Sequence, residues 1–363
     1  MFSLRARKAA KNPAGELCHP IERRHCRVFA HSPCAVNFWL LEVFVQKRKL
    51  GQHGPEVPGL CLGGNVYGWT LAEGGVFHQL DRAVAAGLNF IDTADIYSRW
   101  VPGHRGGESE TIIGNWLKKT GRRQDVLIAT KLGIEMGEGK SGLGAKYVAQ
   151  AVDDSLRRLQ TDYIDLYQAH TDDEKTPLEE TLGAFDRLVK AGKVRYLGAS
   201  NYAGSRLAEA IDISRKNGLA EYVSLQPHYN LVERKSFESD LLPVVEKYQV
   251  GVIPYYSLAS GFLTGKYRPG AETQSSARAA GVEKYRTSEG YTVVDALTEV
   301  AASHKAAPAS VALAWLSAQP GITAPIVSAT SEKQLDEIIA AATLELDRAK
   351  LDYLTQASAA FAV

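Results

Sequence analysis

Short apolar runs rich in β-forming residues alternate along the chain with longer segments whose apolar positions recur at a helical period. In one such segment Val148, Val152 and Leu156 recur every four residues and therefore share one face of a helix. The segment that contains Leu182 ends at Gly192, and glycine commonly ends helices. The predicted strands are residues 60–63, 89–93, 126–131, 164–170, 194–200, 223–226, 250–256 and 324–328.

The spacing of these strands predicts the fold. From Thr93 to Tyr256, successive strand ends lie between 26 and 39 residues apart, and a strand–helix–strand unit needs roughly 30 residues. Eight such units predict an α/β fold, a (β/α)8 or TIM barrel, in a single domain. A doubly wound parallel sheet uses the same alternation and is the alternative.

Two segments depart from this alternation. The interval between Tyr256 and Ser328 holds an insertion at about residues 260–291, rich in Gly, Ser, Arg and Tyr, which predicts a long loop after strand seven. Ahead of the first strand, residues 47–50 and 56–58 flank Gln52-His53-Gly54, which is a hairpin pattern. In a barrel, such a hairpin could close the N-terminal end.

The composition is that of an ordinary globular protein. The 363 residues are 45% hydrophobic and 23% charged, which excludes a disordered tail, a disulfide miniprotein and a collagen-like fibre. No apolar run approaches the roughly 20 residues that span a bilayer. The formal net charge of +1 gives no electrostatic reason to expect nucleic acid or a membrane surface as partner.

The N-terminal part differs from the rest of the chain. Residues 1–45 hold seven Lys/Arg against three acids and three of the four cysteines, whereas the remainder carries 35 basic and 38 acidic residues. The cysteines lack the tight spacing of zinc ligands, and a mitochondrial targeting peptide would have fewer acids and more serines. We therefore interpret 1–45 as an extension outside the fold and 46–363 as the barrel. We predict no metal site, and Cys61 as the single cysteine of the barrel favours a cytoplasmic location.

Titratable side chains end three successive predicted strands. Asp92, Lys131 and His170 each close an otherwise apolar run, and Tyr97 follows Asp92 by five residues. Strand alternation places each of the three on the same face as the apolar residue two positions earlier. Because chemistry in a (β/α)8 barrel collects at the carboxyl ends of the strands, we expect these side chains to converge on one rim.

Such a group is suited to acid catalysis. A free tyrosine has a pKa near 10, and a lysine ammonium close to it favours the phenolate and lowers that pKa. Asp92 would supply the counter-charge that a buried Lys131 needs. A histidine can then donate a hydrogen bond to a carbonyl oxygen and orient it.

Each residue also has a plainer interpretation when taken alone. Asp92 could cap a helix, although Asp95 suits a cap or turn better. Tyr97 and His170 could be packed structural side chains. Lys131 could form a Schiff base, as in aldolases with barrel folds. The joint occurrence at three successive strand ends favours the catalytic interpretation.

The chain resembles the aldo-keto reductases in three motifs: GLNFIDTADIY at 87–97, IATK at 128–131 and YQAH at 167–170. The resemblance runs from about Gln46 to the C-terminus. Within the family, the chain is similar to a bacterial branch that also resembles the β-subunits of potassium channels. It implies a (β/α)8 barrel that binds NADPH across its C-terminal rim. It further implies Tyr97 as general acid, Asp92 and Lys131 as its tuning pair, and His170 as the residue that orients the carbonyl.

The resemblance also implies the remaining site residues. In its terms Ser200, Asn201 and Gln226 bind the carboxamide, and Tyr256 stacks on the nicotinamide. Residues expected along the pyrophosphate and adenosine are Ser257, Leu258, Ser260, Gly261, Lys266, Arg278, Ser328, Thr330, Gln334 and Glu337. Aromatic residues expected to line the substrate pocket, with core packing as the alternative for each, are Tyr67, Trp69, Trp100, Tyr229 and Tyr255.

Three positions bear on how far the resemblance extends. Thr330 stands where many relatives carry Arg, and Ile338 stands where they carry Asn. Both positions lie at the adenosine end, so NADH remains open beside NADPH. His170 stands where the channel β-subunits have Asn, which favours a working reductase.

The sequence thus predicts an oxidoreductase that uses NADPH or NADH to reduce a small-molecule aldehyde or ketone. Two alternatives remain: a redox-sensing regulatory subunit that binds NADPH and turns over slowly, and a Schiff-base aldolase that uses Lys131. The sequence leaves the substrate and the oligomeric state open.

Overall fold

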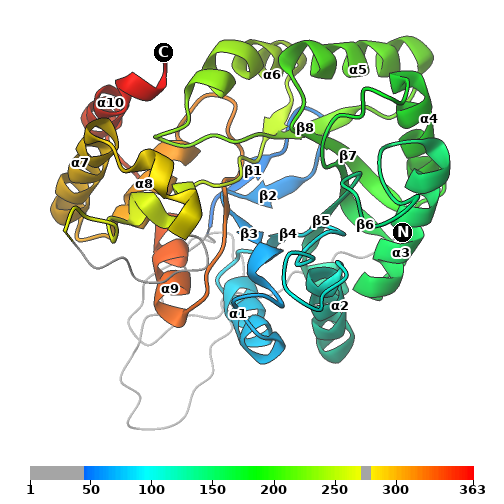
Figure 1. The fold of residues 1–363 in the computed structure, drawn as a ribbon, viewed down its shortest axis with the longest axis horizontal. Helices are drawn as coiled ribbons and strands as arrows, with labels where there is room; N and C mark the ends of the chain where they lie inside the picture. The colour runs from blue at the N-terminus through cyan, green and yellow to red at the C-terminus, as the bar shows by residue number, and fades with distance from the viewer. Residues whose placement is uncertain (1–44, 271–278) are drawn as a thin grey trace, which may run out of the picture. The chain divides into compact units, whose positions relative to one another are not determined.

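Eight parallel strands form the centre of the molecule (Figure 1). The computed structural model describes residues 45–270 and 279–363, all within the compact unit Val43–Val363. The sheet order is β10-β3-β4-β5-β6-β7-β8-β9. Its strands are β3 (Cys61–Gly63), β4 (Phe90–Asp92), β5 (Leu127–Leu132), β6 (Ile164–Ala169), β7 (Val194–Ser200), β8 (Tyr222–Gln226), β9 (Gly251–Val252) and β10 (Ile326–Val327).

Backbone contacts join the two ends of this sheet. Val252 of β9 pairs in parallel with Ile322, and the Thr323 N–H donates to the Val252 carbonyl at 2.8 Å. The Ile326 N–H donates to the carbonyl of Pro254 at 2.9 Å. The curled sheet and its helices therefore make the predicted (β/α)8 barrel, and the doubly wound alternative is wrong.

Helices surround the strands (Figure 1). They are α1 (Glu73–Ala85), α2 (Glu108–Thr120), α3 (Ala145–Leu159), α4 (Leu178–Lys190), α5 (Gly204–Asn217), α6 (Leu242–Tyr248), α7 (Ser288–His304), α8 (Pro308–Ser317), α9 (Glu332–Ala341) and α10 (Arg348–Ala357). Helix α3, for example, buries one face, with Val148 and Val152. In the described ranges, no helix is both long enough and apolar enough to cross a bilayer.

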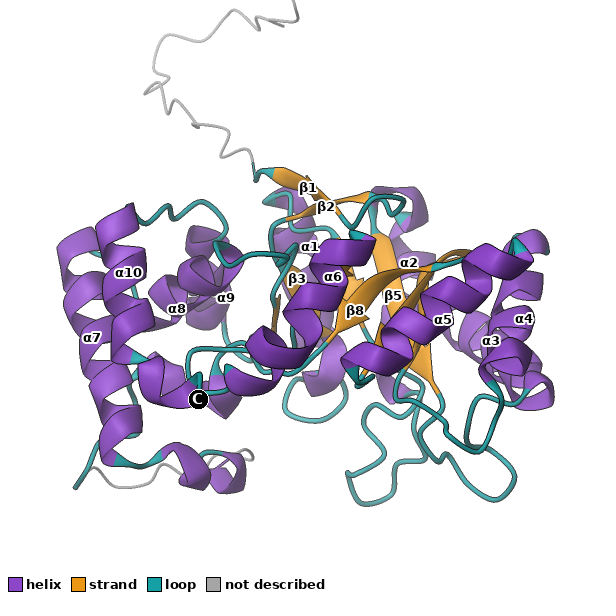
Figure 2. Cartoon of the chain, turned by 90° about the horizontal axis from the view of Figure 1, so that it is seen from above, coloured by secondary structure: helices purple, strands orange, loops and turns teal. Residues whose placement is uncertain are grey.

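The predicted hairpin closes one end of the barrel. Strands β1 (Lys47–Lys49) and β2 (Glu56–Pro58) pair antiparallel, and Figure 2 shows them at the end opposite the long loops. Leu50 and Val57 are fully buried and belong to the apolar cluster inside the barrel. Gly51 has φ +66°, and a Cβ there would lie 2.5 Å from the carbonyl oxygen of Val223. The chain can therefore pass this close to the strands only with glycine at this position.

Some boundaries differ from the predicted ones. β9 and β10 are much shorter than residues 250–256 and 324–328, because Pro254 and Pro325 have no N–H to donate to a strand ladder. The expected extension 1–45 lies outside the described residues, except for Val45, which packs against the core.

The insertion lies between β9 and β10, as predicted, but it is more than a loop. α7 begins at Ser288, inside the expected loop, and the Thr287 hydroxyl caps it by accepting the Gly290 N–H at 3.1 Å. Val282 and Tyr285 are buried. The flanking parts of the insertion thus pack against the barrel, while residues 271–278 lie outside the described ranges.

We expect Leu50→Ala to lower the free energy of unfolding by about 2–5 kcal/mol, because it leaves a cavity at the closed end of the barrel. Lys47→Ala, in the same hairpin but at an exposed position, is the control. Chemical denaturation measures both variants. Equal midpoints would show that Leu50 does not help close the barrel.

Candidate active site

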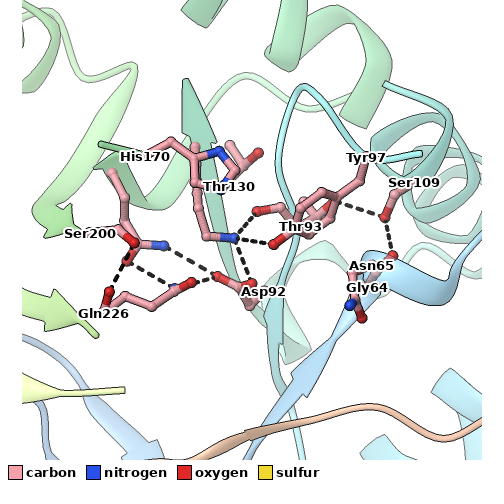
Figure 3. A network of polar contacts seen from close by, with 12 residues as sticks. Gly64, Asn65, Asp92, Thr93, Tyr97, Ser109, Thr130, His170, Ser200 and Gln226 are labelled. Atoms are coloured by element: carbon pink, nitrogen blue, oxygen red, sulfur yellow. Dashed lines mark hydrogen bonds and ion pairs between the residues drawn. The ribbon is translucent and has the colours of Figure 1, made fainter. Parts of the chain in front are cut away.

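A polar cluster that includes Asp92, Tyr97 and Gln226 lies at the C-terminal rim (Figure 3), and its central member is Lys131. It comes from β5 and is fully buried. Its ammonium lies 2.7 Å from Asp92 Oδ2 and 3.1 Å from the phenol oxygen of Tyr97. A third hydrogen bond, of 2.7 Å, goes to the carbonyl oxygen of Thr93. The three donors of the ammonium are therefore all used within the cluster.

The charge of Lys131 is retained despite its burial. Burial disfavours the ammonium, but the Asp92 carboxylate and Tyr97 outweigh it, and the pKa of Lys131 is raised. An amine must be neutral to attack a carbonyl. The structure therefore gives no support to the aldolase alternative.

Tyr97 stays protonated at neutral pH. The sequence predicts that Lys131 lowers the pKa of Tyr97, and Lys131 does act in that direction, but burial outweighs it and the pKa is raised. The expected effect of Lys131 is therefore present, but strand-end position could not show how deeply the ring is buried. Since Lys131 donates to the phenol oxygen, the phenolic proton remains available for donation to another acceptor.

Two glutamines hold the second oxygen of Asp92. Gln226 Nε2 donates to Asp92 Oδ1 at 2.9 Å, and Gln168 Nε2 donates to the same atom at 3.3 Å. Gln226 was expected to bind the carboxamide, and Gln168 was not singled out. Gln168 shares a strand face with His170, so strand alternation could have found it.

His170 follows β6 and lies beside Tyr97, with ring centroids 6.0 Å apart. Burial, and then the Lys131 charge, hold its pKa well below the usual range. The imidazole is therefore neutral at physiological pH. Its Nδ1 is buried and has no hydrogen-bond partner within the described part of the chain.

Asn201 connects the ends of three strands. Its side-chain amide donates to the carbonyl of His170 at 2.9 Å and accepts from the Tyr255 hydroxyl at 2.8 Å. The neighbouring Ser200 hydroxyl donates to the carbonyl of Gln226 at 2.9 Å. The carboxamide-binding residues implied by the resemblance thus lie together beside the Lys131 cluster.

Tyr255 and Tyr256 differ in where they lie. Both follow the end of β9, and Tyr255 is half-buried. Its hydroxyl reaches Asn201. Tyr256, by contrast, is 49% exposed. The geometry therefore brings Tyr255, expected to line the substrate pocket, closer to the predicted carboxamide site than Tyr256.

Strained backbone gathers in the same region. Outside glycine, seven described residues have positive φ. Three of them, Gln160, Gln249 and Lys305, cap the C-termini of α3, α6 and α7. The other four are Asn201, Tyr256, Ala259 and Ser260, in or beside the segments expected to bind the cofactor. Such positions cost of order 1–3 kcal/mol each and concentrate at functional sites.

The other residues expected to bind the cofactor differ in their burial and contacts. The Ser257 hydroxyl is buried 2.7 Å from the Ile326 carbonyl, so it joins β9 to β10 rather than facing a ligand. Lys266 is exposed, with its ammonium 5.0 Å from the ring centroid of Tyr267. Leu258, Ser260 and Gly261 share this loop. Arg278 lies outside the described residues.

The residues expected at the adenosine end lie around the start of α9. The N–H and the hydroxyl of Thr330 both donate to the side-chain oxygen of Gln334, at 2.7 and 3.0 Å. The Ser328 hydroxyl donates to Asn65 at 2.7 Å. Glu337 is half-buried within α9.

The expected aromatic pocket is only partly assembled. The Trp100 ring lies edge-on to Trp69 and to Tyr97, at centroid distances of 5.6 and 5.8 Å, and it is 48% exposed. Tyr67 and Tyr229 are only 1% exposed and belong to the hydrophobic core. For those two the core-packing alternative holds, because an aromatic residue near a strand end can equally pack under the helices.

Comparisons with known proteins identify the family of the chain. The model of the aldo/keto reductase family matches residues 59–359. The chain is 36% identical to an uncharacterized oxidoreductase, YrpG, of Bacillus subtilis, over 82% of this chain and 91% of that protein. It is 33% identical to Protein tas of Escherichia coli, over 83% and 94%. It is 32% identical to a probable voltage-gated potassium channel subunit beta of rice, over 81% and 90%.

We expect Asp92→Asn to destabilise the fold by about 3–5 kcal/mol at pH 7, because it leaves the Lys131 charge buried without a partner. The pKa of Lys131 should then fall below that of the unfolded chain. The unfolded state binds more protons between the two values, so the variant should regain stability as the pH rises toward about 10.

The double variant Asp92→Asn/Lys131→Met is the matched control, since it buries no charge. Its loss of stability in chemical denaturation should be smaller than the sum of the two single losses. Additive losses would show that the two side chains do not stabilise each other.

Proposed function

The chain belongs to the aldo/keto reductase family, and from this we propose that it is an NADPH-dependent reductase that converts an aldehyde or ketone to the alcohol. The observation that carries the proposal is the protonated, buried phenol of Tyr97, whose oxygen accepts from the Lys131 ammonium at 3.1 Å. Tyr97 is the proton donor, and the phenolate that it leaves has the Lys131 cation beside it.

The rim offers what a nicotinamide cofactor needs. Ser200 and Asn201 supply polar side chains beside the cluster, and strained backbone at Ala259 and Ser260 shapes the loop expected at the pyrophosphate. When bound, the dihydronicotinamide supplies a hydride to the carbonyl carbon of the substrate. We expect Tyr256 to pack against it, since this ring is 49% exposed and lies edge-on to Tyr255, whereas Tyr255 is stacked on His228.

The protein's own groups handle the proton. The substrate oxygen would lie within reach of the Tyr97 hydroxyl and the neutral His170 ring, which orients it. As negative charge develops on that oxygen, Tyr97 transfers its proton and becomes a phenolate. The Lys131 ammonium stabilises this phenolate, and Asp92 keeps the ammonium in place. Solvent then reprotonates Tyr97.

A second candidate is a regulatory subunit that binds NADPH and turns over slowly. It is favoured by relatives named as probable or putative voltage-gated potassium channel subunits beta in rice, fission yeast and Arabidopsis. The neutral His170 beside Tyr97 favours the reductase. Measured turnover separates the two.

We expect Tyr97→Phe to lower kcat/KM by at least about 100-fold, because the proton donor is lost. The Kd for NADPH, measured from fluorescence quenching, should stay within about twofold, since the phenol contributes no charge to cofactor binding. Tyr353→Phe, at an exposed position, is the matched control.

The assay follows NADPH and NADH oxidation separately over aldehydes, ketones, α-dicarbonyls and sugars. Retained activity in Tyr97→Phe would contradict the assigned role. Tight NADPH binding with slow turnover of every carbonyl would favour the regulatory subunit instead. A higher kcat/KM with NADH would overturn the choice of NADPH.

A further inference from the structure

A cavity lies behind the loop that carries Tyr97. Its volume is about 540 Å³, and it is bounded by residues 95–106, the loop after β5 and the helix α3. Tyr97, Lys131 and His170 do not line it. It is therefore separate from the catalytic cluster, although the two share a loop.

Asp95 is the buried carboxyl of this cavity. It is 2% exposed, and neither of its oxygens has a hydrogen-bond partner of normal geometry in the described residues. Asp95 lies in a turn, as the sequence favours, since the Tyr97 N–H donates to the Ala94 carbonyl at 3.2 Å. Leaving a buried polar group unpaired costs free energy, and most such groups in proteins do have a partner.

The neighbours of Asp95 keep it protonated. Burial, and then the Glu110 carboxylate, raise the pKa of Asp95 to about 8. Glu110 is itself satisfied, because it accepts from Thr130 and from Arg158 at 2.6 Å each. At neutral pH, Asp95 is therefore mainly a neutral acid that can donate a hydrogen bond into the cavity.

Exposed cations also line the cavity. Arg105 and Lys140 line it, are exposed, and make no side-chain hydrogen bond or ion pair within the part of the chain that the structure describes. Arg99 also lines it and donates only to the carbonyl of Glu135. Arg157, by contrast, is paired with Asp154. Within the described residues, three cations that line the same cavity as Asp95 thus have no carboxylate partner.

We propose that this cavity binds a small multivalent anion, with Arg105 and Lys140 supplying charge and Asp95 donating a hydrogen bond. The class includes phosphate esters and di- or tricarboxylates, which share two or more negative charges and several acceptor oxygens. Because Asp95 and Arg99 flank Tyr97 in one loop, a bound anion would hold that loop in place. The site itself does not depend on the proposed reductase activity.

Sulfate is the probe, since its charge does not change between pH 6 and pH 10. We expect equilibrium dialysis of the full chain at pH 7 and constant ionic strength to show one saturable site. Arg105→Ala and Lys140→Ala should each raise the Kd about tenfold, as expected for losing a charged hydrogen bond. Lys146→Ala removes the same charge from an exposed position on α3 that does not line the cavity, and should leave the Kd unchanged.

Two results would overturn the proposal. One is a wild-type protein without saturable sulfate binding. The other is an equal effect of Lys140→Ala and Lys146→Ala, which would indicate diffuse attraction to a basic surface. Because the replaced side chains are exposed, all three variants should unfold at the wild-type temperature, which a thermal melt checks.

The pH dependence tests Asp95 separately. The titratable and charged groups that face it are Glu110 of α2, Lys131 of β5, Tyr147 and Arg158 of α3, and Tyr167 of β6. As the pH rises through about 8, Asp95 ionises and would repel the anion. Sulfate binding should weaken between pH 7 and pH 9 in the wild type but not in Asp95→Asn. The same weakening in both proteins would contradict the role given to Asp95.

Discussion

The ion pair between Lys131 and Asp92 organises the side chains at the C-terminal rim of the barrel. A lysine with no exposed surface needs a counter-charge and three acceptors, and it has them in Asp92, Thr93 and Tyr97. Asp92 in turn needs donors for its second oxygen, which fixes two glutamine side chains on β6 and β8. One buried charge thus sets side chains on four strands.

The two ends of the barrel meet opposite physical requirements. At the N-terminal end the hairpin adds Leu50 and Val57 to a dry, apolar interior, which favours stability. At the other end the interior becomes polar, and the backbone around Ala259 and Ser260 takes up costly conformations. Apolar burial in one half offsets the free-energy cost of the polar, strained half. A functional site at the C-terminal end is what a (β/α)8 barrel favours.

The sequence predicted the features that follow from periodicity. Strand alternation and spacing gave the barrel, the hairpin and the strand ends that bring Asp92, Lys131 and His170 together. It could not show how deeply a ring is buried, so the net pKa of Tyr97 and the choice between pocket and core for Tyr67 and Tyr229 stayed open. It also could not show which residue of the pair Tyr255 and Tyr256 faces Asn201, because β9 ends at Val252 and alternation is no longer a guide.

The central claim is that the Lys131 charge lowers the pKa of Tyr97, while burial of the phenol raises it. NMR of protein labelled with ¹³C at tyrosine Cζ measures the pKa of Tyr97 directly, with Tyr97→Phe identifying the signal. We predict a higher pKa for Tyr97 in Lys131→Met than in the wild type, because burial and the Asp92 charge, which both raise this pKa, would remain. An unchanged or lower pKa in that variant would contradict the account.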